Sequence, residues 1–227
     1  MKKIQIVLLL CLFSTAALQA QKAFRGTMTF TYEISGEGAE QMKAFMPEGM
    51  VVKYGDNKMA TEMKGGMLSA MMGRIIVNAG EAYVVKDSDQ AVYVMDEEDK
   101  EGAQEAVENQ PKATKVDGET KEILGYTCQK YLLTMKQDGQ QIEQVVWATD
   151  AFKAPDMKLP SQQGSMGSGI LSMGGIDAMP LQVDVAMPNM PVTMVLKATE
   201  MEEGEVPDEA FAKPAGYEEK PFSEMMK

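Results

Sequence analysis

The sequence predicts a mainly β protein, built as a single curved antiparallel sheet (a half-barrel) with a few short helices. Three observations lead to this prediction. Several short segments alternate between apolar and polar residues, as half-buried strands do. Turn-forming residues separate these segments at close intervals. The connections are too short for the crossovers that parallel strands require, so neighbouring strands are expected to be antiparallel.

The N-terminal 20 residues have the order of a secretory signal peptide. Lys2 and Lys3 precede an apolar run over residues 4–13, and small residues follow up to Ala20. The apolar run is too short to span a bilayer, and no later stretch approaches that length. We expect cleavage after Ala20, a single β-rich domain over residues 21–227, export to the periplasm or the medium, and no transmembrane segment in the mature chain.

The first half of the predicted domain is a series of strands. Residues 24–35 alternate strictly, and a short helix is expected from about Ala39 until Pro47 stops it. Residues 49–63 read as a hairpin that turns at residues 55–57. Residues 74–96 contain three short strands with turns at 78–80 and 87–89. One face of the hairpin is expected to carry Met50, Val52, Tyr54, Met59, Thr61 and Met63.

The second half is less regular. Residues 96–112 are acidic and predict an exposed loop or a frayed helix, and a hairpin is expected to turn at Asp138 and Gly139. Residues 161–175 are rich in glycine and serine and predict a loop that could act as a flap. A last strand pair flanks residues 188–191, and the turn-rich tail, residues 205–227, is expected to pack its aromatic side chains onto the end of the sheet.

Composition excludes several classes of function. The chain contains no histidine, which removes Ser-His-Asp and Cys-His catalysis and histidine-ligated zinc. Without the first 20 residues it has 20 basic and 34 acidic residues, and such an acidic surface repels nucleic acid. No nucleotide-binding or hydrolase motif occurs. We therefore predict that the protein is not an enzyme, has no catalytic residues and needs no cofactor. Cys128, the only cysteine left after cleavage, is predicted to be a buried, unreactive thiol.

Methionines spaced by four residues are the most unusual local pattern, at Met59, Met63, Met67 and Met71. Thioethers bind Cu(I), so one interpretation of these four residues is a Cu(I) site. Methionine also fills irregular gaps in cores, which is the default interpretation of residues in phase with apolar strand neighbours. A third interpretation leaves the methionine-lined face partly open to an apolar ligand. Gly65 and Gly66 interrupt the row, so its two halves are expected to lie on separate elements.

Short motifs in the second half resemble a family of secreted Gram-negative bacterial proteins that carry a domain of unknown function. The motifs are a Gly-Tyr-x-Cys-x-x-Tyr strand, a tryptophan on the following strand and a terminal Phe-x-x-Pro-x-Gly-Tyr segment. The matching residues are Gly125, Tyr126, Cys128, Tyr131, Trp147, Phe211, Pro214, Gly216 and Tyr217. The resemblance implies an envelope protein, distantly similar in architecture to the periplasmic carriers of outer-membrane lipoproteins (the LolA/LolB-like half-barrel), whose apolar concave face shelters acyl chains.

These observations together predict a non-catalytic periplasmic or secreted binding protein for a lipid or another hydrophobic ligand. Two alternatives stay open: a Cu(I)-binding protein that uses the methionine row, and an interaction module of an envelope assembly that pairs an open sheet edge with a partner strand. The sequence does not identify individual ligand-binding residues.

Overall fold

The computed structural model describes residues 21–95, 112–137, 140–154, 175–186 and 191–225. The predicted signal peptide therefore lies outside the described residues, as do the acidic segment 96–111, the turn at Asp138 and Gly139, and the glycine- and serine-rich segment except for Gly175. No helix in the described part of the chain is long and apolar enough to cross a membrane.

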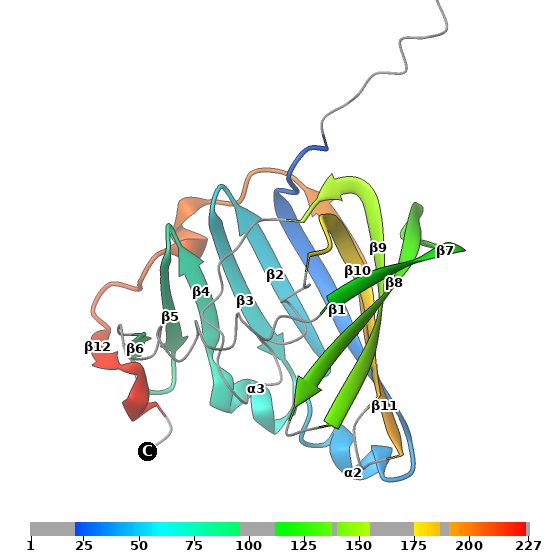
Figure 1. Ribbon diagram of the computed structural model, residues 1–227. Coiled ribbons are helices and arrows are strands. Elements are labelled where there is room, and N and C mark those ends of the chain that lie inside the picture. Colours follow the sequence, from blue (N-terminus) through cyan, green and yellow to red (C-terminus); the bar gives the residue numbers. More distant parts are fainter. Residues whose placement is uncertain (1–20, 96–111, 138–139, 155–174, 187–190, 226–227) are drawn as a thin grey trace, which may run out of the picture.

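The described strands form one 12-stranded sheet, in the order β12-β6-β5-β4-β3-β2-β1-β11-β10-β9-β8-β7. The sheet is strongly curved, and both α-helices lie at the same end of it (Figure 1). This confirms the predicted fold class. The elements are β1 (Gly26–Gly36), α2 (Ala39–Lys43), β2 (Gly49–Gly55), β3 (Lys58–Lys64), α3 (Gly66–Met72), β4 (Arg74–Asn78), β5 (Glu81–Lys86), β6 (Ala91–Val94), β7 (Lys112–Ile123), β8 (Tyr126–Gln137), β9 (Gln140–Lys153), β10 (Ala178–Ala186), β11 (Val192–Glu203), η1 (Asp208–Phe211), β12 (Glu218–Pro221) and η2 (Phe222–Glu224).

Residue alternation sets the two faces of the sheet. Met28 pairs with Val52, Val52 with Thr61 and Thr61 with Ile75, so these side chains share one face. Buried side chains from β1–β5 and from β8–β11 join in one hydrophobic cluster on this face. Because strands far apart in the sheet order contribute to the same cluster, this is the inner, concave face. The hairpin, the three following strands and the short helix at Ala39 match the sequence prediction.

The aromatic residues of the C-terminal segment pack near one end of the sheet order, as predicted, but they use both faces. Phe211 packs on the convex face against Ile76, Tyr83 and Val85, whereas Phe222 packs on the other face with Val84 and Tyr93. The segment then adds β12 alongside β6 in a parallel pairing, whereas all other strand pairs in the described sheet are antiparallel. Close strand spacing does not forbid this parallel pair, since the long chain between residues 95 and 217 supplies the crossover.

Candidate ligand-binding face

The concave face is an apolar surface that runs across most of the sheet. Threonines and charged residues alternate with its members along β1, so the opposite face of that strand meets solvent. The face is also rich in methionine, whose unbranched thioether side chain repacks at low energetic cost. Its buried members include Met28, Phe30, Met50, Val52, Tyr54, Met59, Thr61, Met63, Val77, Ala82, Val84, Tyr93, Val146, Val183, Val185, Met194 and Leu196.

Aromatic rings close one end of the concave face. Phe24 makes edge-to-face contacts with Tyr54 and Phe152, at centroid distances of 5.7 and 5.4 Å, and Tyr126 contacts Phe152 at 5.6 Å. Contacts of this geometry are favourable beyond the area they bury. Burial also raises the pKa of the Tyr54 hydroxyl. Three strands and the N-terminal segment thus converge on one tightly packed end, which is a poor route for a ligand.

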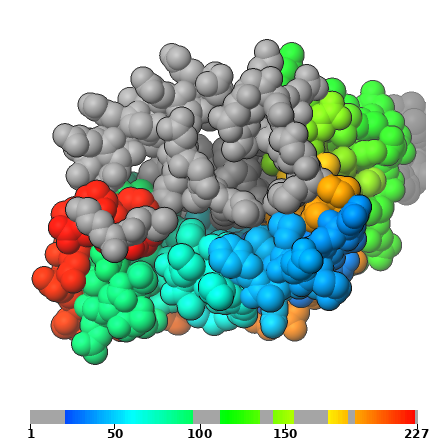
Figure 2. Space-filling view, turned by 90° about the horizontal axis from the view of Figure 1, so that it is seen from below, coloured from blue at the N-terminus to red at the C-terminus, as the bar shows by residue number. Residues whose placement is uncertain are grey.

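The opposite end of the face is bordered by α2, α3 and the loop between α2 and β2, which together we call the rim. The Leu68 N–H donates to the Phe45 carbonyl oxygen at 3.0 Å, so the loop and α3 touch. The approach is close: a Cβ atom on Gly66 would lie 2.0 Å from the Met46 carbonyl oxygen. Figure 2 views the molecule from this side and shows α2 (blue) beside α3 (cyan).

Large apolar side chains at the rim are exposed to solvent. The exposed fractions are 42% for Phe45, 62% for Met67 and 49% for Met71. None of the seven residues of α3 is buried, and neither terminus of this helix has a side-chain cap. Met42 and Leu68, by contrast, are partly buried against the cluster of the concave face. The rim therefore links the apolar interior to solvent through apolar side chains and is weakly anchored.

Hydroxyl groups interrupt the apolar face at several places, among them Tyr32 and Thr61. The Tyr32 hydroxyl donates only a long contact, 4.0 Å, to the Met50 sulfur, and burial raises the pKa of Tyr32 to about 12. The Thr61 side chain is buried, and its Oγ1 has no hydrogen-bond partner within the described structure. Sequence alternation predicted the direction of Thr61, but nothing in the sequence indicates whether its hydroxyl is satisfied.

The methionine row divides between these two regions. Met59 and Met63 are buried on the concave face, opposite Tyr54 and Met50 on β2, whereas Met67 and Met71 lie exposed on α3. Gly65 and Gly66 separate the two halves, as the sequence suggested. The described residues also contain no group of three or more histidine, cysteine or acidic side chains that could hold a metal ion. Cu(I) binding by the four methionines stays a prediction.

The residues that carry the family resemblance have structural roles. Cys128 is fully buried, as predicted, and burial raises the pKa of its thiol to about 11. The Lys121 and Lys130 ammonium groups lie 4.3 and 5.9 Å from the centre of the Trp147 ring, within range of cation–π attraction. The Phe211 carbonyl oxygen accepts hydrogen bonds from the Tyr83 hydroxyl at 2.5 Å and from the Asn78 side chain at 3.2 Å.

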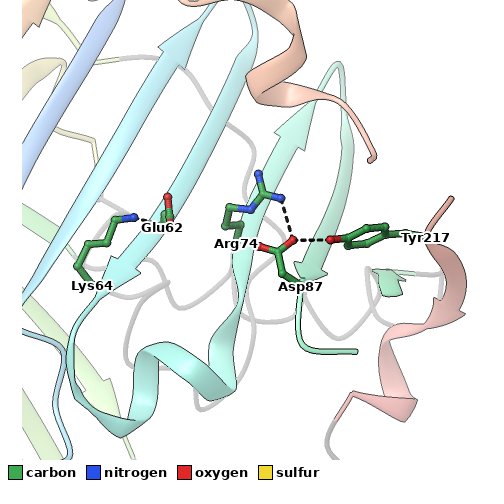
Figure 3. A network of polar contacts seen from close by, with 5 residues as sticks. All are labelled: Glu62, Lys64, Arg74, Asp87 and Tyr217. Carbon is green, nitrogen blue, oxygen red and sulfur yellow. Dashed lines mark hydrogen bonds and ion pairs between the residues drawn. The ribbon is translucent and has the colours of Figure 1, made fainter. Parts of the chain in front are cut away.

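Tyr217 fastens the C-terminal segment through a polar network (Figure 3). Its hydroxyl donates to Asp87 Oδ1 at 3.0 Å, and the same oxygen accepts from Arg74 at 3.2 Å. The hydrogen bond to Asp87 raises the pKa of the Tyr217 hydroxyl. Glu62 and Lys64 form a separate ion pair in the same view. These contacts attach the part of the C-terminal segment around Tyr217 to Arg74 on β4 and to Asp87 in the turn after β5.

Comparison with protein families confirms the resemblance. The profile of a domain of unknown function, DUF4412, matches residues 24–217. Curated proteins give no significant match.

Several solved structures are similar to the chain at low identity. An uncharacterized conserved protein from Thermus thermophilus has 9% identity and a TM-score of 0.46, with 86% of this chain and 90% of that one covered. The lipoprotein LppX from Mycobacterium tuberculosis has 8% identity and a TM-score of 0.37, with 79% and 90% covered. A LolA superfamily protein from Nitrosomonas europaea has 11% identity and a TM-score of 0.34, with 86% and 91% covered. At such low identities and TM-scores, function has to be inferred from the chain's own residues.

Proposed function

Because the chain belongs to the DUF4412 family, which is described only as a domain of unknown function, we propose its function from the geometry of its own residues. We propose a non-catalytic, exported binding protein that holds a lipid or another hydrophobic ligand against the concave face. The observation that carries the proposal is the continuity of this apolar face with the exposed methionines of the rim.

Burial of apolar surface supplies the affinity in this proposal. Each square ångström of apolar surface removed from water contributes about 25 cal/mol. The concave face offers aliphatic and thioether side chains from β1 to β11, with few polar groups among them. These side chains are nearly fully enclosed in the structure, Met28 and Val52 completely so. A ligand therefore has to displace side chains, which methionine permits more readily than branched or aromatic residues.

Access is proposed at the rim. The aromatic end is held by edge-to-face rings from the N-terminal segment, β2, β8 and β9, whereas α3 buries none of its residues. Displacement of α3 exposes little additional apolar surface, so it requires less free energy than opening the aromatic end. Met67 and Met71 would give an incoming apolar molecule its first contacts.

Two measurements test the proposal. The protein is purified from its native envelope without detergent, and native mass spectrometry with lipid extraction examines what accompanies it. A polarity-sensitive hydrophobic dye is then titrated into the delipidated protein. We expect a co-purifying apolar molecule and saturable dye binding. A ligand-free protein that also leaves the dye unbound would contradict the proposal.

A matched pair of variants locates the dye. Met63 and Val92 are both buried, at 8% and 1% exposure, but Met63 lies at the rim end of the concave face and Val92 packs on the convex face in the cluster of Phe211. M63Q places an amide among apolar contacts and should weaken dye binding by about tenfold. V92N also places an amide among apolar contacts, so it should lose stability but keep the dye affinity of the wild type. Equal binding by both variants would place the ligand elsewhere.

The two alternatives lack a specific supporting observation. The methionine row is split between a buried and an exposed half, as described above. The edge strand β7, which an interaction module would offer to a partner strand, is rich in lysine and acidic residues and has a register shift between Lys115 and Thr120. Charges and bulges are features that oppose pairing at sheet edges.

A further inference from the structure

Thr61 is a polar residue in the middle of an apolar surface. Its cross-strand neighbours are Val52 on β2 and Ile75 on β4. Met59 and Met63 precede and follow it on the same face of β3. The side chain is only 3% exposed, so water does not reach the hydroxyl in this structure.

The Thr61 hydroxyl is buried and makes no hydrogen bond within the described structure. Its oxygen has no hydrogen-bond partner in the described part of the chain, and burying a hydroxyl without a partner is unfavourable. Thr149 provides a comparison, since it is 2% exposed but its Oγ1 accepts a hydrogen bond from the Ala151 N–H at 3.3 Å. Strand propensity alone does not explain Thr61, because valine has the same shape, an equal preference for strands and no polar atom.

The position of Thr61 along β3 indicates which part of a bound ligand its hydroxyl would meet. Met59 pairs with Tyr54 toward the aromatic end, and Met63 pairs with Met50 toward the rim, so Thr61 lies midway along the apolar face of β3. At about 3.3 Å per residue, Met59 and Met63 are about 13 Å apart along the strand. A chain bound along β3 would thus have apolar surface on both sides of Thr61.

We propose that the Thr61 hydroxyl donates a hydrogen bond to a carbonyl oxygen of the ligand, which is an acyl chain joined through an ester or an amide. This inference rests on the proposed function and narrows its ligand class. The carbonyl lies at Thr61, the apolar tail extends past Met59 toward the aromatic end, and the polar head is directed past Met63 to the rim. A pure hydrocarbon leaves the hydroxyl unsatisfied and binds more weakly.

Three probes with the same pyrene-labelled hydrocarbon chain test this inference on the delipidated full-length mature protein. One is a methyl ester, one an N-methyl amide and one a plain alkane. We expect the wild type to bind at least one carbonyl probe about threefold to tenfold more tightly than the alkane, the range of one neutral hydrogen bond. T61V should lose this preference and bind the alkane as the wild type does. T61S, which keeps the hydroxyl, and T149V, a matched buried threonine, should both retain the preference.

The outcomes separate this inference from the proposed function. Binding of all three probes without a preference in the wild type overturns the role of Thr61 while leaving hydrophobic binding in place. A preference that persists in T61V does the same. Failure of all probes to bind the wild type overturns both proposals. A preference for the ester alone identifies an acylglycerol-type ligand, and a preference for the amide alone identifies an N-acylated one; either result supports the inference.

Discussion

Substitution of Gly66 by alanine should loosen the rim without touching the concave face. Gly66 begins α3 with φ +67°, and an added Cβ would lie 2.0 Å from the Met46 carbonyl oxygen. Real Cβ atoms approach backbone no closer than about 3 Å, so α3 and the loop must separate by about 1 Å. The hydrogen bond between the Leu68 N–H and the Phe45 carbonyl oxygen, now 3.0 Å long, would then be lost.

The magnitude follows from two contributions. A left-handed alanine costs about 1–2 kcal/mol, and the lost hydrogen bond costs about 1 kcal/mol. G66A should therefore be about 2–3 kcal/mol less stable than the wild type in urea denaturation. If displacement of α3 is the slow step of dye entry, the strain of about 2 kcal/mol raises the free energy of the closed state but not of the open one. The barrier to opening falls by that amount, and dye association in stopped-flow fluorescence becomes up to about 30-fold faster.

Gly80 offers the control. It also has a positive φ, +91°, but an added Cβ there meets nothing within 4 Å, and it lies in the turn between β4 and β5. G80A should lose about 1–2 kcal/mol of stability through backbone strain alone, with unchanged association kinetics. Equal association rates for G66A and G80A would refute access through the rim.

Three further substitutions test the energetics. T61V should raise the free energy of unfolding of the ligand-free protein by about 1–2 kcal/mol, because it removes an unsatisfied buried hydroxyl; a loss of stability in urea denaturation would show that the hydroxyl is bonded in solution. F211A should lower that free energy by about 3–5 kcal/mol yet leave dye affinity intact, because Phe211 packs on the convex face. Burial raises the pKa of the Cys128 thiol from 9.0 to about 11, so on raising the pH the thiol ionises in the unfolded state before it does in the folded state. The wild type should therefore lose stability relative to C128A between about pH 9 and pH 11. Parallel pH profiles of stability for the two proteins would contradict this.

Local alternation predicted the first half of the sheet well. The hairpin β2–β3 has the expected face, with Met50, Val52 and Tyr54 opposite Met63, Thr61 and Met59. Turn chemistry marked its limits correctly, since Asn57 adopts a positive φ of 53° in the turn. These elements are specified by neighbours in the sequence, so a pattern of period two is sufficient to find them.

Strands without apolar alternation were not visible in the sequence. Residues 112–123 form the long strand β7, but most of its side chains are exposed and show no apolar alternation. The two-residue turn after it was also missed, because Leu124 has a positive φ of 52°, a conformation that leucine rarely adopts. β12 is a short charged strand whose place depends on the Glu218 N–H bonding to the Gln90 carbonyl oxygen at 3.0 Å.

At the candidate site, too, the sequence predicted some features and missed others. The sequence identified methionines on the strand face and placed Met67 and Met71 on a separate piece, both of which the structure confirms. It did not indicate the exposed Phe45 beside them, because that proximity depends on the close approach of Gly66 to the Met46 backbone. Nor did it distinguish the unsatisfied hydroxyl of Thr61 from the satisfied one of Thr149, which depends on partners and not on residue type.

Burial on the two faces of the sheet suggests where the protein can adapt to a ligand. The middle of β5 is buried on both faces, since the C-terminal segment covers its convex side with Phe211. Tyr217 and the Asp87–Arg74 pair add a second attachment there. On β1 and β2, by contrast, the convex side chains are intermediate or exposed, and no residue of α3 beside β3 is fully buried. A ligand that needs the concave face to expand will meet least resistance where only one face is packed, which is the β1–β3 region that leads to the rim.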